Sequence, residues 1–398
     1  MRNLINLRLF KKPCVNNYFS LIFLILFFYL STPACYGQSK RVPSDNPLSS
    51  QLDSLVDRSV QEYFQDKKAV GLSIGLVQQG KPHFYNYGET KAGNGQLPDS
   101  KTIYELGSIT KSFTGIILAQ AVLDKKINLE DDIRKYLKGS FPNLSYQGTP
   151  IRIKDLANHT SRITRIFPNM WERPSYDSLN PLFNYSRKLL YEGLHQMKMD
   201  TLPGKIYSYS NMAVALLGTI LEDSYGQDYF SLVSKNILKP YRMMNTRIDI
   251  RSIAPDRVAW PHDAQRQPVP LWDLGEVPAM GALRSTAADM VNYINANNAE
   301  TNPAVKLSHQ RTFGSGEEGM ALNWFIHNSP KGYRILEHGG GTGGSRSSLD
   351  CIPQLNAGLV ILTNSLANRN TLEKELLAIL NKTRHKKRSG YPTSSAHH

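Results

Sequence analysis

The chain has 398 residues, 40% of them hydrophobic and 10% aromatic, enough for a large core in one domain or two closely packed domains. Its net charge of +14 is concentrated at the ends, with four positive charges in residues 1–37 and five in residues 382–398. Taking these nine from the total leaves +5 for the body, a mild excess that requires no nucleic-acid partner.

Residues 1–37 have the three parts of a secretory signal peptide. A basic segment precedes the apolar run 21–30, which is too short for an ordinary membrane span, and small residues follow as far as Gly37. We therefore expect an exported, periplasmic protein that is cleaved near Gly37. Cleavage before Cys35, followed by lipidation, is the alternative, and it would leave a membrane-anchored lipoprotein.

Only Cys351 of the three cysteines remains after cleavage near Gly37, so we expect no intrachain disulfide. Cys351 follows a predicted strand and is expected to be a buried small residue. The basic residues 382–398 are predicted to form a disordered, solvated tail. Contact of this tail with an anionic membrane surface is the alternative.

The first part of the body predicts a helix and a hairpin. Residues 38–50 are polar, contain two prolines and are expected to form an exposed leader. Apolar residues then recur at helical spacing over 52–63, which predicts an amphipathic helix. Strands are predicted over 70–77 and 82–87, joined by a tight turn at Gln79-Gly80. This order indicates an antiparallel sheet with a helix on one face.

The segment Glu105–Gly115 precedes the apolar run 116–123 and holds Ser108 and Lys111 three residues apart. On a helix, this spacing puts both side chains on one face, about 5–6 Å apart. A serine hydroxyl becomes a nucleophile when a base lies beside it. Lysine can be that base where desolvation or a neighbouring cation lowers its pKa well below about 10.4. Gly107 permits a tight entry into the helix, whose first N–H groups can face an oxyanion.

Residues 125–250 have a mostly helical pattern and predict an inserted all-helical domain. Within it, we expect helices over 211–221 and 229–238. The proline-rich residues 251–280 predict an extended segment with little regular structure.

The last part of the body predicts strands followed by a helix. A helix begins within 281–290, with Ser285 or Thr286 as its cap. Strands and one further helix close the fold, with the strands at 322–327, 333–336, 346–352 and 359–363 and the helix at 372–380. The predicted fold class is α/β (α+β): an antiparallel sheet flanked by the terminal helices, built from residues 51–124 and 251–381, plus the helical domain 125–250.

A second stretch of chemical interest is Tyr209-Ser210-Asn211, in a loop just ahead of a helix. A phenol there can pass a proton between Ser108, a leaving group and Lys111. A cationic Lys111 would lower the phenol pKa from about 10 and allow a tyrosinate base near neutral pH. Asn211 offers an amide donor and acceptor to a substrate amide. Packing tyrosines and a cap from Ser210 or Asn211 are the alternative.

A third stretch, Glu337-His338-Gly339-Gly340-Gly341, lies between two predicted strands. Glycines in a strand often mark close approach by another backbone or a ligand, so a substrate can lie along this edge. His338 can donate to a substrate carboxylate or assist proton transfer, since its unperturbed pKa is about 6.5. A flexible hairpin with a structural histidine is the alternative.

Taken together and in this order, the three stretches resemble the three motifs of the penicillin-recognising serine hydrolases. That superfamily includes class C β-lactamases, D-alanyl-D-alanine carboxypeptidases and related esterases and peptidases. Residues 153–161 and 281–289 resemble two accessory stretches of the same family. The resemblance covers about residues 50–380 and implies a β-lactamase/transpeptidase-like fold, with the site between the sheet and the helical domain.

The resemblance implies one role for each matching residue, and it implies no cofactor and no metal. In chain order, Ser108 is the acylated nucleophile, Lys111 and Tyr209 share the acid–base work, Asn211 holds the substrate amide, His338, Gly339 and Gly340 bind substrate, and the N–H groups of Ser108 and Gly341 form the oxyanion hole.

The chain departs from the family pattern in three places. Many β-lactamases have lysine and then threonine or serine where this chain has His338-Gly339, and the lost charge and hydroxyl disfavour efficient binding of a β-lactam carboxylate. Arg162 stands where relatives often carry glycine, which reshapes the nearby loop. There is no match to the class A glutamate motif, so Tyr209, Lys111 or the substrate must activate the deacylating water.

We therefore expect an exported serine hydrolase that cleaves an amide or ester, acting on a D-residue peptide or related small acyl substrate. β-Lactam hydrolysis is the close alternative. A non-catalytic penicillin-binding or sensing protein is a second hypothesis. A metal hydrolase is a third, disfavoured because the spacing of its candidate ligands matches no helical zinc motif. Those candidates are His159, His195, His262 and His338.

Overall fold

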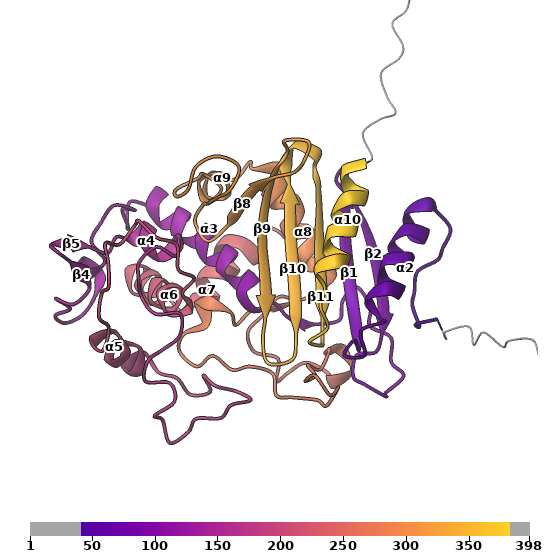
Figure 1. The fold of residues 1–398 in the computed structure, drawn as a ribbon, viewed down its shortest axis with the longest axis horizontal. Coiled ribbons are helices and arrows are strands. Elements are labelled where there is room, and N and C mark those ends of the chain that lie inside the picture. Colours follow the sequence, from indigo (N-terminus) through magenta and orange to yellow (C-terminus); the bar gives the residue numbers. More distant parts are fainter. Residues whose placement is uncertain (1–40, 383–398) are drawn as a thin grey trace, which may run out of the picture. The chain divides into compact units, whose positions relative to one another are not determined.

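The computed structural model describes residues 41–382 (Figure 1). The predicted signal peptide, the start of the predicted leader and the basic residues beyond 382 lie outside these residues. Within the described part of the chain, no helix has the length and apolar character needed to cross a membrane.

A seven-stranded antiparallel sheet, in the order β2-β1-β11-β10-β9-β8-β7, forms the centre of the structure (Figure 1). Each predicted strand has a counterpart, although the one expected over 322–327 starts only at Phe325. The strands are β1 (Gly71–Gln78), β2 (Lys81–Gly88), β7 (Gly319–Met320), β8 (Phe325–Asn328), β9 (Arg334–Gly341), β10 (Arg346–Ile352) and β11 (Ala357–Thr363).

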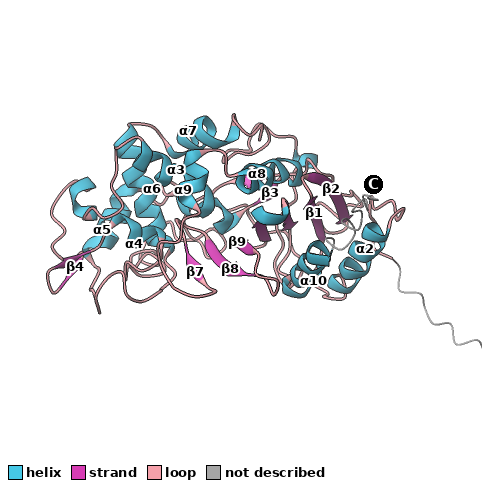
Figure 2. Ribbon diagram, turned by 90° about the horizontal axis from the view of Figure 1, so that it is seen from above, coloured by secondary structure: helices cyan, strands magenta, loops and turns pink. Residues whose placement is uncertain are grey.

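Helices cover both faces of this sheet. On one face, α2 (Gln51–Tyr63) and α10 (Asn370–Lys382) lie side by side and pack on alternate apolar residues of β1 and β11, such as Ile74 and Ile361 (Figure 2). On the other face lies α8 (Ala287–Ala299), so close that a Cβ on Gly75 would lie 2.7 Å from Val291. Burial on both faces explains why β1 and β11 are almost continuously apolar.

The remaining helices pack beside the sheet and share its larger hydrophobic core, which contains both Leu349 of β10 and Leu216 of α6. The central helix α3 is buried on nearly every side, as its apolar run predicts. These helices are α3 (Thr110–Leu123), α4 (Ile153–Ala157), α5 (Arg187–His195), α6 (Asn211–Tyr225), α7 (Tyr229–Val233) and α9 (Pro303–Ser308).

The structure corrects two expectations and settles a third. The predicted all-helical insert also contains a short hairpin, β4 (Ser145–Tyr146) and β5 (Thr149–Pro150). The leader is not wholly exposed, because Asn46 is buried and donates to Tyr87 Oη at 2.6 Å. Thr286, and not Ser285, caps α8 by accepting from the backbone N–H of Asp289.

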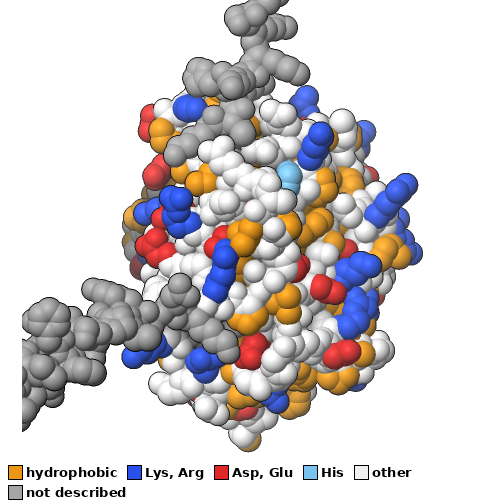
Figure 3. All heavy atoms as spheres, turned by 90° about the vertical axis from the view of Figure 1, so that its right-hand side faces the viewer, with side chains coloured by type: hydrophobic (Ala, Val, Ile, Leu, Met, Phe, Trp, Pro, Cys, Tyr) orange, Lys and Arg blue, Asp and Glu red, His pale blue; other side chains and the backbone are white. Residues whose placement is uncertain are grey.

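The surface on the side where β2 and α2 lie carries basic and acidic side chains interspersed with apolar ones (Figure 3). No large patch of a single sign is seen on this face. This agrees with the small net charge predicted for the body of the chain.

Candidate active site

Two short strands position the segment that carries Ser108. Strand β3 (Tyr104–Glu105) pairs with β6 (Arg284–Ser285), and a single turn at Gly107–Ile109 then leads into α3. Gly107 has φ +51°, and a Cβ there would lie 2.6 Å from the backbone nitrogen of Gly341. Glycine is therefore required at this entry, and it brings Ser108 beside the end of β9.

Glu105 fixes this segment to the turn between β9 and β10. Its buried carboxylate accepts from Thr342 Oγ1 at 2.5 Å, from Ser345 Oγ at 3.1 Å and from the backbone N–H of Trp272 at 2.7 Å. Burial raises the pKa of Glu105, while these hydrogen bonds oppose the shift. The sequence analysis missed this residue, although an acidic residue directly before the serine segment was a usable signal.

Ser108 Oγ is in contact with both predicted acid–base residues. Lys111 Nζ lies 2.9 Å from it, and Tyr209 Oη donates to it at 2.8 Å. Lys111 Nζ also donates to the carbonyl oxygen of Met280 at 2.5 Å. A neutral amine that donates to Met280 keeps a lone pair that can take the proton of the Ser108 hydroxyl.

Desolvation shifts the pKa of both acid–base candidates. Lys111 is fully buried, and burial, followed by the charge of Arg165, lowers its pKa well below 10.5. Burial raises the pKa of Tyr209 to about 12, despite its hydrogen bond to Ser108 and the nearby Arg165. These two shifts run against the predicted tyrosinate base, since they favour the neutral forms of both side chains. This arrangement suits Lys111 to the role of base and Tyr209 to the role of acid.

The glycines of the third motif allow close approach by other parts of the protein. A Cβ on Gly340 would lie 2.0 Å from the carbonyl oxygen of Leu106, and one on Gly339 would lie 2.7 Å from Arg369 Nη2. The pairing of β8 with β9 ends at Glu337. Among the described strands, the segment 338–341 therefore has an unpaired edge beside Ser108.

His338 does not have the chemistry expected of it. It is buried, and its Nδ1 lies 2.7 Å from the carbonyl oxygen of Gly339. Because that oxygen only accepts, Nδ1 carries the proton and Nε2, which has no partner, is a bare acceptor. Burial and the charge of Lys111 lower the pKa of His338 to about 3. A neutral ring in this tautomer has no donor at Nε2, which runs against donation to a substrate carboxylate, whereas the predicted assistance in proton transfer stays a prediction.

The second motif is held by the first accessory stretch. Ser210, and not Asn211, caps α6 through its side chain, and its backbone N–H donates to His159 Nδ1 at 3.1 Å. The His159 ring lies 4.3 Å from the Tyr209 ring. Asn211 begins α6 and donates from its backbone N–H to the carbonyl oxygen of Arg165 at 2.9 Å. Sequence analysis assigned no role to Arg165.

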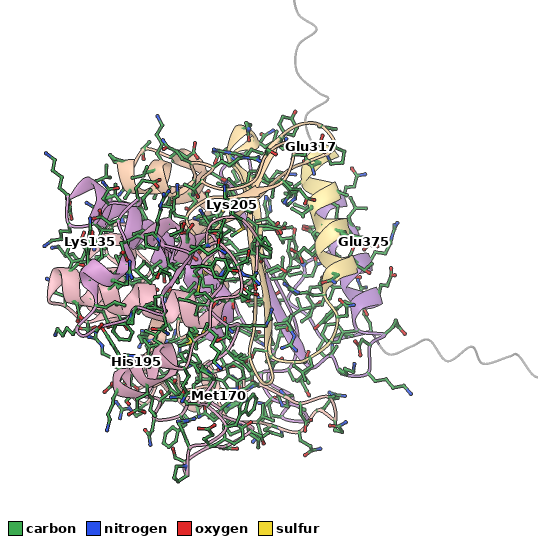
Figure 4. The ribbon with its side chains drawn as sticks, turned by 60° about the vertical axis from the view of Figure 1, so that its left-hand side comes forward. Lys135, Met170, His195, Lys205, Glu317 and Glu375 are labelled. Atoms are coloured by element: carbon green, nitrogen blue, oxygen red, sulfur yellow. The ribbon has the colours of Figure 1, made fainter. Side chains whose placement is uncertain are left out.

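The candidate histidines do not form a metal centre. His195 lies on α5, where its exposed ring stacks on Phe141 at 4.3 Å (Figure 4). Within residues 41–382, the groups of three or more potential metal ligands include no histidine. Within the described part of the chain, the four candidate histidines therefore do not come together as the metal-hydrolase hypothesis requires.

Residues 56–382 match the Beta-lactamase family, and the chain belongs to that family. It is similar to the D-alanyl-D-alanine-carboxypeptidase/endopeptidase AmpH of Escherichia coli strain K12, with 27% identity over 362 residues, which cover 85% of this chain and 91% of AmpH. It is also similar to a Beta-lactamase of Yersinia enterocolitica, with 26% identity over 293 residues and 70% of each chain covered.

Two solved structures share the fold. The octameric penicillin-binding protein homologue from Pyrococcus abyssi has a TM-score of 0.72 and 22% identity, covering 83% of this chain and 78% of that one. The β-lactamase/D-alanine carboxypeptidase from Yersinia pestis, complexed with citrate, has a TM-score of 0.71 and 23% identity, covering 83% and 99%. The β-lactamase/transpeptidase-like fold predicted from the sequence is thereby confirmed.

Proposed function

We propose that the protein is an exported serine hydrolase that cleaves an amide or ester bond through an acyl-enzyme on Ser108. The observation that carries this proposal is the contact of Ser108 Oγ with both Lys111 Nζ and Tyr209 Oη. The proposed substrate is a D-residue peptide or a related small acyl compound.

In the proposed reaction, Ser108 Oγ attacks the carbonyl carbon while its proton passes to Lys111 Nζ. The backbone N–H groups of Ser108 and Gly341 stabilise the oxyanion, and each such donor is typically worth about 10²–10³ in rate. Tyr209 protonates the leaving group and recovers a proton from Lys111. Water then attacks the acyl-enzyme, giving its proton to the neutral Lys111, and Ser108 leaves as the hydroxyl.

One observation favours a peptide over a β-lactam as the substrate. The relative AmpH, covered over 91% of its length, is named for carboxypeptidase and endopeptidase action on D-alanyl-D-alanine. The third motif does not discriminate between the two, since His338 is a neutral acceptor and Gly339 has no hydroxyl, so neither a β-lactam carboxylate nor the C-terminal carboxylate of a peptide finds a charged partner there.

The test compares two substrates on the mature chain. Release of D-alanine from an acyl-D-Ala-D-Ala peptide is measured beside hydrolysis of a cephalosporin, with Ser108→Ala as the inactive variant. Ser54→Ala, on the exposed side of α2, is the matched control and should keep full activity. Peptide cleavage that is lost in Ser108→Ala supports the proposal. Faster cephalosporin turnover would favour a β-lactamase, and acylation without turnover would favour a sensing protein.

Export is proposed from residues 1–37 alone. N-terminal sequencing of the protein recovered from its host should give a mature chain that begins near Gln38. A blocked, lipid-modified Cys35 at the N-terminus would show a lipoprotein instead.

A further inference from the structure

Arg165 is an exposed residue beside the second motif, and it has no ionic partner among the described residues. The guanidinium of Arg165 lies 5.0 Å from the ring centre of Tyr209, and its side chain is exposed. Within residues 41–382, it forms no ion pair and its side chain donates no hydrogen bond. Contact with a ring face leaves the N–H edges of a guanidinium free.

A second arginine on the same loop, Arg162, is already paired with a carboxylate. Arg162, three residues earlier, donates from Nε and Nη2 to the two carboxylate oxygens of Asp200, at 2.9 Å and 2.5 Å. Arg165 has the same five donors in the same planar fork, which matches the geometry of a carboxylate. No carboxylate within residues 41–382 is paired with it.

Arg165 interacts with residues that are expected to act at the substrate. Its carbonyl oxygen accepts from the backbone N–H of Asn211, which is expected to bind the substrate amide. Its charge also lowers the pKa of Lys111 and opposes the upward shift in the pKa of Tyr209. The guanidinium therefore lies on the second-motif side of Ser108, where we expect the acyl part of a substrate.

Four other groups near the site are less well placed than Arg165 to bind an anion. His338 Nε2 is a bare acceptor, and Lys111 is buried with its amine directed at Ser108 and Met280. Lys205, labelled in Figure 4, lies on the loop before the second motif. It lines a separate hollow with Asp155 and Thr312. Arg162 is already paired with Asp200.

We propose that Arg165 binds a carboxylate carried by the acyl part of the substrate and makes the enzyme selective for anionic acyl donors. This inference rests on the proposed function, since it requires an acyl-enzyme on Ser108. A charge-assisted, bidentate hydrogen bond to a carboxylate commonly contributes about 10- to 100-fold in affinity.

The experiment uses two peptides that differ only in the residue on the acyl side of the scissile bond, D-glutamate or D-glutamine. The wild type should prefer the glutamate peptide by about 10- to 100-fold in kcat/KM. Arg165→Gln should bring the ratio of the two values near one, and Arg165→Lys should restore part of it. Lys205→Gln removes a nearby charge from the separate hollow and should keep the wild-type ratio.

The ratio separates binding from a purely electrostatic role. If Arg165 acted only by lowering the pKa of Lys111, Arg165→Gln would slow both peptides equally and the preference would persist, which overturns the inference. Equal kcat/KM values for the two peptides in the wild type would also overturn the inference. So would a chain that cleaves neither peptide although its Ser108 reacts with a fluorophosphonate. Both results leave the proposed function standing. A wild-type chain that neither reacts at Ser108 nor hydrolyses any acyl substrate overturns the proposed function itself.

Discussion

Replacing Gly107 with alanine tests the oxyanion hole, because the new Cβ would meet the backbone of Gly341. It would lie 2.6 Å from the nitrogen and 2.9 Å from the oxygen of Gly341, so the strand must move away. Gly107 also has φ +51°, and a left-handed conformation costs an L-residue about 1–2 kcal/mol. The oxyanion donors act within about 2.7–3.1 Å, so displacing Gly341 should cost about 100-fold or more in kcat.

The assay measures kcat/KM for an acyl-D-Ala-D-Ala peptide together with the urea unfolding midpoint. Gly93→Ala is the matched control, since Gly93 has φ +79° and its Cβ would meet nothing within 4 Å. The control bears the conformational cost without the clash and should keep its activity. If Gly107→Ala is as active as Gly93→Ala to within about threefold, the placement of Gly341 in the oxyanion hole is wrong.

Three further predictions follow from the buried groups. The wild type should gain stability relative to Lys111→Met as the pH rises towards about 10.5. The reason is that the lysine is protonated in the unfolded chain over this range, whereas in the folded chain its lowered pKa leaves it unprotonated. Urea unfolding at pH 7 and 9.5 measures this trend, and an opposite slope would contradict it. The value of kcat/KM should fall on acidification as Lys111 takes up a proton. In Arg165→Gln this acidic fall should occur at higher pH, because the arginine charge no longer lowers the pKa of Lys111. A fall at the same pH as in the wild type would contradict this role of the arginine charge. Glu105→Ala should lower the free energy of unfolding by about 3 kcal/mol, because three donors lose their acceptor. The control Glu375→Gln on α10 should change it by less than about 0.5 kcal/mol. Equal losses in the two variants would contradict this account.

The sequence predicted the parts of the fold that depend on local pattern. The apolar runs of β1 and β11, the helical spacing of α2 and the Ser-x-x-Lys spacing of the nucleophile segment all follow from residue order. Thr286 also follows from local capping chemistry, although the sequence left it undecided against Ser285. The three motifs could be connected only through the family resemblance, because no local rule brings residues about 100 positions apart into contact.

The sequence could not predict what burial does to titratable groups. The acid–base roles of Lys111 and Tyr209 depend on desolvation that only the packed structure imposes. The tautomer of His338 depends on a single carbonyl oxygen, that of Gly339. Polar residues such as Asn46 were expected at the surface, yet they are buried where side-chain hydrogen bonds satisfy them.

The most direct test of the central claim is the site of covalent modification by an acylating substrate analogue. The mature chain is incubated with a labelled penicillin and with a fluorophosphonate near neutral pH, and its mass and peptide map are recorded. The account predicts one adduct per chain, located on Ser108, absent in Ser108→Ala and formed far more slowly in Lys111→Met. An adduct on another residue, or a chain that reacts with neither reagent, would contradict it.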